Sequence, residues 1–235
     1  MLIETAHPRT RLGSGTRTAG LAIAAATIIS TIFVALDRSG GGSTPAEILA
    51  GIARLTTLKE AVHGVAIVSV CAYAFGYASL ARQLGLHRPQ VLAGLVVYLI
   101  GCAAMIAATL LDGFITPHVA MDAMHAAPER VRFAYDLVHY LGVMLNDFAK
   151  LGWILQAVGA LAWSLALMRE KGFDRAIGMI GLLSSVLVGV AILASATNMS
   201  MASLLGVLLA QLIWNLAAAA LLFRSPGASL AAHSG

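Results

Sequence analysis

The sequence carries little charge for its length. Asp, Glu, Lys and Arg make up 11% of the 235 residues, whereas a soluble domain devotes about a quarter of its positions to them. Hydrophobic residues account for 59% of the chain, and the mean hydropathy is +0.86. So few polar groups cannot cover a globular surface. The composition therefore excludes a soluble domain and predicts a protein solvated by lipid.

Several chemical signatures are also missing. The two cysteines, Cys71 and Cys102, lie inside apolar runs, which favours small buried side chains over a disulfide or a redox pair. The net charge of +4 is spread over short loops without a basic stretch or interleaved aromatic residues, which argues against nucleic acid as a partner. The sequence contains no ATP-binding loop, nucleophile elbow or zinc-protease motif, so it carries none of the enzyme signatures that these motifs define.

What the sequence does contain is a set of long apolar runs. A helix needs about 20 apolar residues to cross the roughly 30 Å hydrocarbon core of a bilayer. Five uncharged runs have this length, and a sixth is slightly short but continues a longer helical pattern. The predicted spans are 18–36, 61–81, 91–111, 151–168, 176–196 and 202–223. They predict an all-α, polytopic bundle of six transmembrane helices at 18–223, between tails at 1–17 and 224–235.

Basic residues predict the orientation of this bundle, because Lys and Arg concentrate in cytoplasmic loops. Nine lie in the two tails and in the second and fourth loops: Arg9, Arg11, Arg17, Arg82, Arg88, Arg169, Lys171, Arg175 and Arg224. Five lie in the first and third loops: Arg38, Arg54, Lys59, Arg130 and Arg132. This asymmetry predicts a bacterial-type inner-membrane protein with both termini in the cytoplasm. The run at 18–36 is too long for a secretory leader, so we interpret it as a retained span.

Two further helical features are predicted on the periplasmic side. In the first loop, Thr44, Pro45 and Glu47 occupy capping positions ahead of a helical apolar pattern, which predicts a short amphipathic helix on the membrane surface. The fourth helix begins at Pro128 and meets no breaker before Gly172. Roughly 40 residues at 1.5 Å each give about 60 Å, so its first half must project into the periplasm or lie tilted in the interface.

Polar and metal-capable residues gather on the predicted periplasmic side. An ionisable side chain within a membrane segment costs several kcal/mol unless it is paired or hydrated, so such residues are candidates for function. Each also has a structural interpretation: Glu60 fits a second helix cap, and Asp147 and Lys150 can neutralise each other at i and i+3. The residues of the candidate polar pocket are Glu60, His63, Asp112, His139, Asn146, Asp147 and Lys150. Among them, His63, Asp112, His139 and Asp147 are expected to converge on one point.

Several spacings suit a metal ion. The candidate ligands are His63, Asp112, His118, Asp122, His125, Asp136 and His139. His118, Asp122 and His125 stand at i, i+4 and i+7, on one face of a two-turn helix. Carboxylate-x-x-His pairs at 60–63 and 136–139 are of the kind that hold di-iron centres in helical bundles. A softer set would suit copper instead; its members are His118, Met121, Met124, His125, Met199 and Met201. The cofactor therefore stays unknown, with iron or copper as the alternatives.

The function predicted from these features is that of a multi-pass inner-membrane protein with a polar pocket on its periplasmic side. The pocket would bind a metal and serve a membrane enzyme or redox subunit. One alternative is an accessory subunit of a larger membrane complex, with other membrane subunits as partners. A small-solute transporter is the other, although no predicted span is interrupted by proline near the midplane. The lipid bilayer is a partner in each case.

Overall fold

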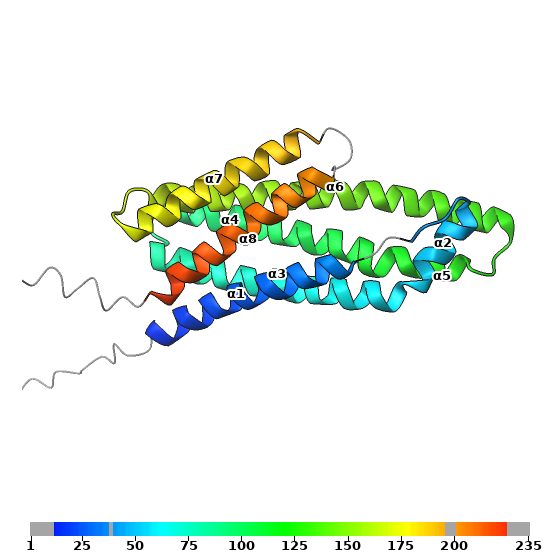
Figure 1. Cartoon of the computed structure of the whole chain (residues 1–235), viewed down its shortest axis with the longest axis horizontal. Coiled ribbons are helices and arrows are strands. Elements are labelled where there is room, and N and C mark those ends of the chain that lie inside the picture. Colours follow the sequence, from blue (N-terminus) through cyan, green and yellow to red (C-terminus); the bar gives the residue numbers. More distant parts are fainter. Residues whose placement is uncertain (1–11, 38–39, 196–200, 225–235) are drawn as a thin grey trace, which may run out of the picture.

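The computed structural model of the chain describes residues 12–37, 40–195 and 201–224, and it is all-helical there (Figure 1). Within this part of the chain, six helical segments are long and apolar enough to cross a membrane, which confirms the predicted bundle. The elements are α1 (Leu12–Leu36), α2 (Pro45–Arg54), α3 (Thr56–Leu84), α4 (Pro89–Leu110), the π-helical turn η1 (Leu111–Ile115), α5 (Thr116–Ala123), α6 (Pro128–Leu167), α7 (Phe173–Leu193) and α8 (Met201–Phe223).

The outer faces of the long helices are apolar. Large side chains such as Val68 on α3, Leu183 on α7 and Leu193 at the end of α7 are mostly exposed, Leu193 to 82%. A soluble monomer rarely exposes apolar patches of more than a few hundred Å². The faces suit contact with lipid instead, and the chain is therefore a multi-pass membrane protein.

Close contact between the antiparallel α4 and α6 forms the centre of the bundle. Gly94 on α4 faces Gly159 on α6, and Gly101 faces Gly152, so both helices space their glycines at i and i+7. A Cβ on Gly159 would lie 2.8 Å from the Gly94 carbonyl oxygen, and one on Gly101 would lie 2.9 Å from the Gly152 carbonyl oxygen. Small residues allow two backbones to approach in this way, which is a common mode of helix packing in membranes.

Buried aromatic side chains fill the core beside this contact. Tyr77 stacks on Trp163, with ring centroids 5.2 Å apart, and it also contacts Tyr98 and Trp214. The polar atoms of two of these rings are satisfied by other helices: the Trp163 indole N–H donates to the Val91 carbonyl, and the Tyr77 hydroxyl donates to Asn215. The core is therefore tied together by directional bonds as well as by apolar contact.

Beyond the ends of α1, α7 and α8, the remaining helices continue as a smaller part of the structure (Figure 1). We call this part the extension; it consists of α2, α5 and the first half of α6. Leu49, Ala120, Ala123 and Ala134 are the buried residues of its hydrophobic cluster. Two predictions are confirmed here: α2 begins at Pro45 with Thr44 as its cap, and α6 is 40 residues long from Pro128, or about 60 Å.

The third span is longer than the sequence predicted. Instead of ending near residue 111, α4 passes through η1 into α5, and the helical span continues to Ala123. A proline inside a helix lacks an N–H, and its ring crowds the carbonyl four residues earlier, which for Pro117 is that of Gly113. The widened turn of η1, closed by the Thr116 N–H on the Leu111 carbonyl, lies at this point and lets the helix continue.

Candidate functional site

Four ionisable side chains meet where the six-helix bundle joins the extension. Asp37 follows the last residue of α1, Lys59 and His63 lie one turn apart near the start of α3, and Asp112 belongs to η1. Lys59 and His63 share one face of α3 because they are four residues apart. We call Asp37, Lys59, His63 and Asp112 the charge cluster.

Lys59 is the central member of the charge cluster. Its Nζ lies 2.9 Å from Asp112 Oδ1 and 3.4 Å from Asp37 Oδ1. The Lys59 side chain is only 9% exposed, against 24% for Asp112 and 31% for Asp37. A buried ammonium is tolerated only with counter-charges and hydrogen bonds. The two carboxylates supply these from α1 and η1, so Lys59 connects three separate elements.

The contacts of His63 show where a proton must lie. Its Nδ1 is 2.9 Å from the Lys59 carbonyl oxygen, which can only accept, so Nδ1 donates. Its Nε2 is 3.0 Å from Asp112 Oδ2. A second proton has to lie between these two atoms, because two lone pairs cannot bond to each other. With that proton on His63, two carboxylates face two cations, and the cluster is neutral overall.

Gly113 allows this arrangement by bringing η1 against α3. A Cβ on Gly113 would overlap the Cβ and Cγ of His63, so the residue next to Asp112 must lack a side chain. Such π-helical turns often occur at functional sites because they re-aim the side chains they carry. Here the turn carries Asp112, the residue that bonds to both Lys59 and His63.

Three members of the charge cluster could hold a metal ion. One carboxylate oxygen each from Asp37 and Asp112 and a ring nitrogen of His63 all lie within 4.8 Å of one another. Among the described residues, no other set of three His, Cys, Asp or Glu gathers so closely. Lys59 bonds to both carboxylates, so a metal ion has to displace the ammonium as well as the proton on His63 Nε2.

Other candidate residues from the sequence lie elsewhere. The structure brings together only His63 and Asp112 of the four residues expected to converge, because His139 and Asp147 are exposed on α6. Asp136, a further candidate metal ligand, is exposed on the same helix. Lys150, which is half-buried like Asn146, donates from Nζ to the Ser195 carbonyl oxygen at 3.1 Å.

The Glu60–His63 pair does not form a joint site. Glu60 lies 3.7 Å from His118 on α5, and both side chains are partly exposed. The prediction that Glu60 belongs to a helix cap is wrong, because α3 begins at Thr56 without a side-chain cap. His118 and Asp122 lie on α5, but this helix ends at Ala123, so the helical face predicted to include His125 does not extend that far.

Asp37 and Lys59 were not among the site residues predicted from the sequence. Asp37 directly follows an uncharged run, and Lys59 precedes one on the same side of the membrane, so both stand at the depth of Asp112 in the predicted topology. An inventory of charges at the ends of spans would have grouped the three. Neither residue belongs to a histidine motif, so histidine spacings alone do not indicate them.

No family model, curated protein or solved structure matches the chain, so its site is interpreted from its own chemistry. The fold and the charge cluster define a multi-pass helical membrane protein with a shielded ionisable site at one end of its bundle.

Proposed function

We propose that the protein is a metal-binding protein of the inner membrane that holds a divalent transition metal at Asp37, His63 and Asp112. The bound metal would serve a membrane enzyme or a redox subunit. One observation carries the proposal: three donor atoms from three separate parts of the chain lie within 4.8 Å of one another.

The charge of the cluster supports an exchange of cations. Two carboxylates are compensated at present by the Lys59 ammonium and by the proton between His63 and Asp112. A divalent ion brings the same two positive charges if the proton leaves and the ammonium turns away. A long lysine side chain near a span end can move its head group toward the interface. Binding therefore leaves the net charge of a poorly solvated site unchanged, which avoids a large desolvation penalty.

The donor set favours iron over copper among the two cofactors predicted from the sequence. Two carboxylate oxygens and one imidazole nitrogen suit Mn²⁺, Fe²⁺ or Zn²⁺, whereas copper(I) prefers sulfur ligands. Met121 and Met124, two of the sulfur residues considered for copper, are exposed at the end of the extension. Three protein ligands leave coordination positions open for water or substrate, which is the arrangement of catalytic rather than purely structural metal sites.

The basic residues support a periplasmic position for the charge cluster. Arg82, Arg88, Arg169 and Arg175 lie near the opposite ends of α3, α4, α6 and α7. Lys and Arg concentrate on the cytoplasmic side of inner-membrane proteins. By this rule the extension and the charge cluster face the periplasm.

Metal analysis of the detergent-purified protein tests the proposal. After treatment with a chelator, the full chain would be loaded with Fe²⁺, Mn²⁺ or Zn²⁺, and bound metal measured by mass spectrometry. We expect about one ion per chain and a fall in affinity of at least about tenfold in H63Q and in D112N, because each removes a ligand. D136N and H139Q change the same residue types at exposed positions on α6 and serve as matched controls. Absence of stoichiometric metal, or equal losses in the controls, would contradict the proposal.

Lys59→Met separates a metal site from a purely structural ion pair. Without the ammonium, the two carboxylates lose a cation, so metal affinity should rise and added metal should restore the lost thermal stability. In addition, metal affinity of the natural protein should increase with pH, since binding releases the proton from His63. A destabilised K59M variant that metal does not rescue would mean that the charge cluster only holds helices together.

One observation favours the accessory-subunit alternative. Phe133 and Tyr140 are each 68% exposed on the projecting half of α6, and they share a helical face because they are seven residues apart. An exposed apolar face outside the membrane is suited to a partner protein. This alternative becomes the better one if the metal measurements fail.

A further inference from the structure

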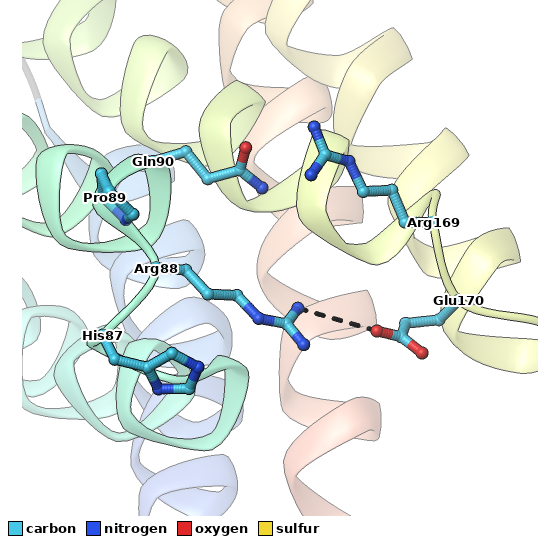
Figure 2. Close-up of a pocket in the computed structure, with 6 residues that line it drawn as sticks. All are labelled: His87, Arg88, Pro89, Gln90, Arg169 and Glu170. Atoms are coloured by element: carbon cyan, nitrogen blue, oxygen red, sulfur yellow. Dashed lines mark ion pairs between the residues drawn. The ribbon is translucent and has the colours of Figure 1, made fainter.

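The end of the bundle opposite the charge cluster holds a groove between two loops (Figure 2). Its volume is about 670 Å³, and its lining residues are His87, Arg88, Pro89, Gln90, Arg169 and Glu170. Figure 2 shows Arg88, from the α3–α4 connection, and Gln90, from the first turn of α4, reaching toward Arg169 and Glu170 on the α6–α7 connection. The groove thus brings together residues that are about eighty positions apart in the chain.

The two connections are short and held by tight turns. Gly85 ends α3 with a φ of 95°, and Gly172 precedes α7 with a φ of 64°. Residues with side chains rarely adopt this left-handed region, so each turn depends on its glycine. These turns hold Arg88 and Arg169 on opposite sides of one space.

The Arg88 guanidinium in the groove keeps bonding capacity. Arg88 Nη1 is 3.7 Å from Glu170 Oε1, whereas a charge-assisted hydrogen bond measures about 2.7–2.9 Å. The ion pair is therefore loose, and both side chains are more than 40% exposed. A competing anion with better geometry can take the place of the Glu170 carboxylate, because guanidinium groups bind phosphate through paired N–H donors.

The groove lies where membrane-spanning segments end, which is the level at which lipid head groups are expected. It is bounded by the ends of α3 and α6 and the starts of α4 and α7, all of them membrane-spanning segments. Leu86 in the α3–α4 connection, Leu92 on α4 and Phe173 on α7 expose apolar surface beside the groove. A ligand with a phosphate at one end and acyl chains at the other matches both features. A free phosphate would use only the basic side chains.

We infer that this groove binds the phosphate of an anionic phospholipid. Arg88 and Arg169 donate to the phosphate oxygens from opposite sides, and the Gln90 carboxamide supplies a further donor. The acyl chains lie along the exposed apolar faces of the adjacent spans. Basic pockets between helices at a membrane surface recognise anionic head groups by this combination of charge and depth.

Reconstitution of the full chain into nanodiscs tests this inference. Thermal stability and co-purified lipid would be compared in phosphatidylcholine alone and in mixtures with phosphatidylglycerol. The anionic lipid should stabilise the natural protein. It should bind at least about tenfold more weakly to the R88Q/R169Q variant, because two charge-assisted contacts are lost. R175Q removes the same charge at the same end but outside the groove, and it should bind the lipid as the natural protein does.

Glu170→Gln provides a second test, in which the expected change is a gain of lipid binding and therefore cannot result from misfolding. This variant removes the carboxylate that competes for Arg88, so the affinity for phosphatidylglycerol should increase. Unchanged or weaker binding would overturn the inference, as would an equal loss in R175Q and R88Q/R169Q, which would indicate diffuse attraction. Inorganic phosphate in detergent should neither stabilise the protein nor displace the lipid. If it does either, the groove is a site for free anions instead.

Discussion

Adding one methyl group at Gly113 tests whether contact between η1 and α3 positions the charge cluster. The new Cβ would overlap the Cβ and Cγ of His63, whose Nε2 lies 3.0 Å from Asp112. These atoms are close to the α3 backbone, so rotation of a flexible side-chain end cannot relieve the overlap. Overpacking of this kind costs about 1–3 kcal/mol. The higher helix propensity of Ala compared with Gly stabilises the folded state by up to about 1 kcal/mol and offsets part of this cost. Gly113→Ala should therefore lower the free energy of unfolding by about 1–2 kcal/mol.

Gly64, the neighbour of His63 along α3, offers a matched control. A Cβ there would meet nothing within 4 Å, so Gly64→Ala keeps only the gain in helix propensity, about 0.5–1 kcal/mol. The same chemical change should thus have opposite signs at two positions that flank one histidine. The expected difference of about 2 kcal/mol corresponds to roughly thirtyfold in the unfolding equilibrium.

Reversible unfolding in mixed micelles, followed by the loss of helical circular dichroism, measures both variants. The metal affinity of G113A should also fall, because η1 can no longer hold Asp112 against His63. If G113A is as stable as G64A, η1 does not approach α3 closely, and the geometry of the charge cluster is wrong.

Three more predictions use comparable measurements. Lys59→Met should lower the free energy of unfolding by about 2–4 kcal/mol, since it leaves partly buried carboxylates without their cation. Adding Asp112→Asn to this variant should recover part of the lost stability. Additive effects of the two substitutions would show that the two side chains do not interact. Gly101→Leu should prevent the close approach of α4 to α6 and lower the free energy of unfolding by more than about 2 kcal/mol. Gly189→Leu is the control and should be tolerated, because a Cβ at Gly189 meets nothing within 4 Å. The Ser43 backbone N–H holds the pKa of Glu47 below its ordinary value of 4.5. The resulting stabilisation of α2 is complete above that value and is lost as the pH falls through the lower folded-state pKa. Protection of α2 amides from hydrogen exchange should show this acid loss, and E47Q should abolish it.

The helices could be predicted from the sequence where local chemistry decides the outcome. Pro128 at a helix start and an unbroken pattern after it were enough to predict the length of α6, and the Thr44 cap was enough to place α2. The end of the third span could not be predicted in this way. Pro117 is a breaker by local rules, but the widened turn of η1 removes its conflict with the preceding carbonyl, and packing of α5 against α2 and α6 stabilises the helix beyond it.

The candidate site could be predicted only in part. The sequence indicates the depth of a side chain in the membrane, but it does not indicate how the helix that carries it is rotated about its axis. His63 and Asp112 were expected at similar depths from the antiparallel course of their helices, and they are in contact. His139 and Asp147 were expected to face the same pocket because they lie two helical turns apart, yet the rotation of α6 leaves both exposed. That rotation is set by contacts of Gly152 and Gly159 with α4, a long-range feature that no local pattern reveals.

The charge cluster also explains how α1 is held against α3 in an apolar solvent. Lipid tails are as apolar as leucine side chains, so apolar contact alone does not select one rotation of a membrane helix over another. Between α1 and α3, Gly76 lies against Ile23 so closely that a Cβ would overlap the Ile23 side chain, and this contact sets their distance in the middle of the bundle. At the end, the Asp37–Lys59 contact of 3.4 Å fixes the rotation of α1, while Asp112 fixes that of η1 at 2.9 Å. Because Lys59 contacts both carboxylates, any cation that replaces it must lie within reach of Asp37 and Asp112 together.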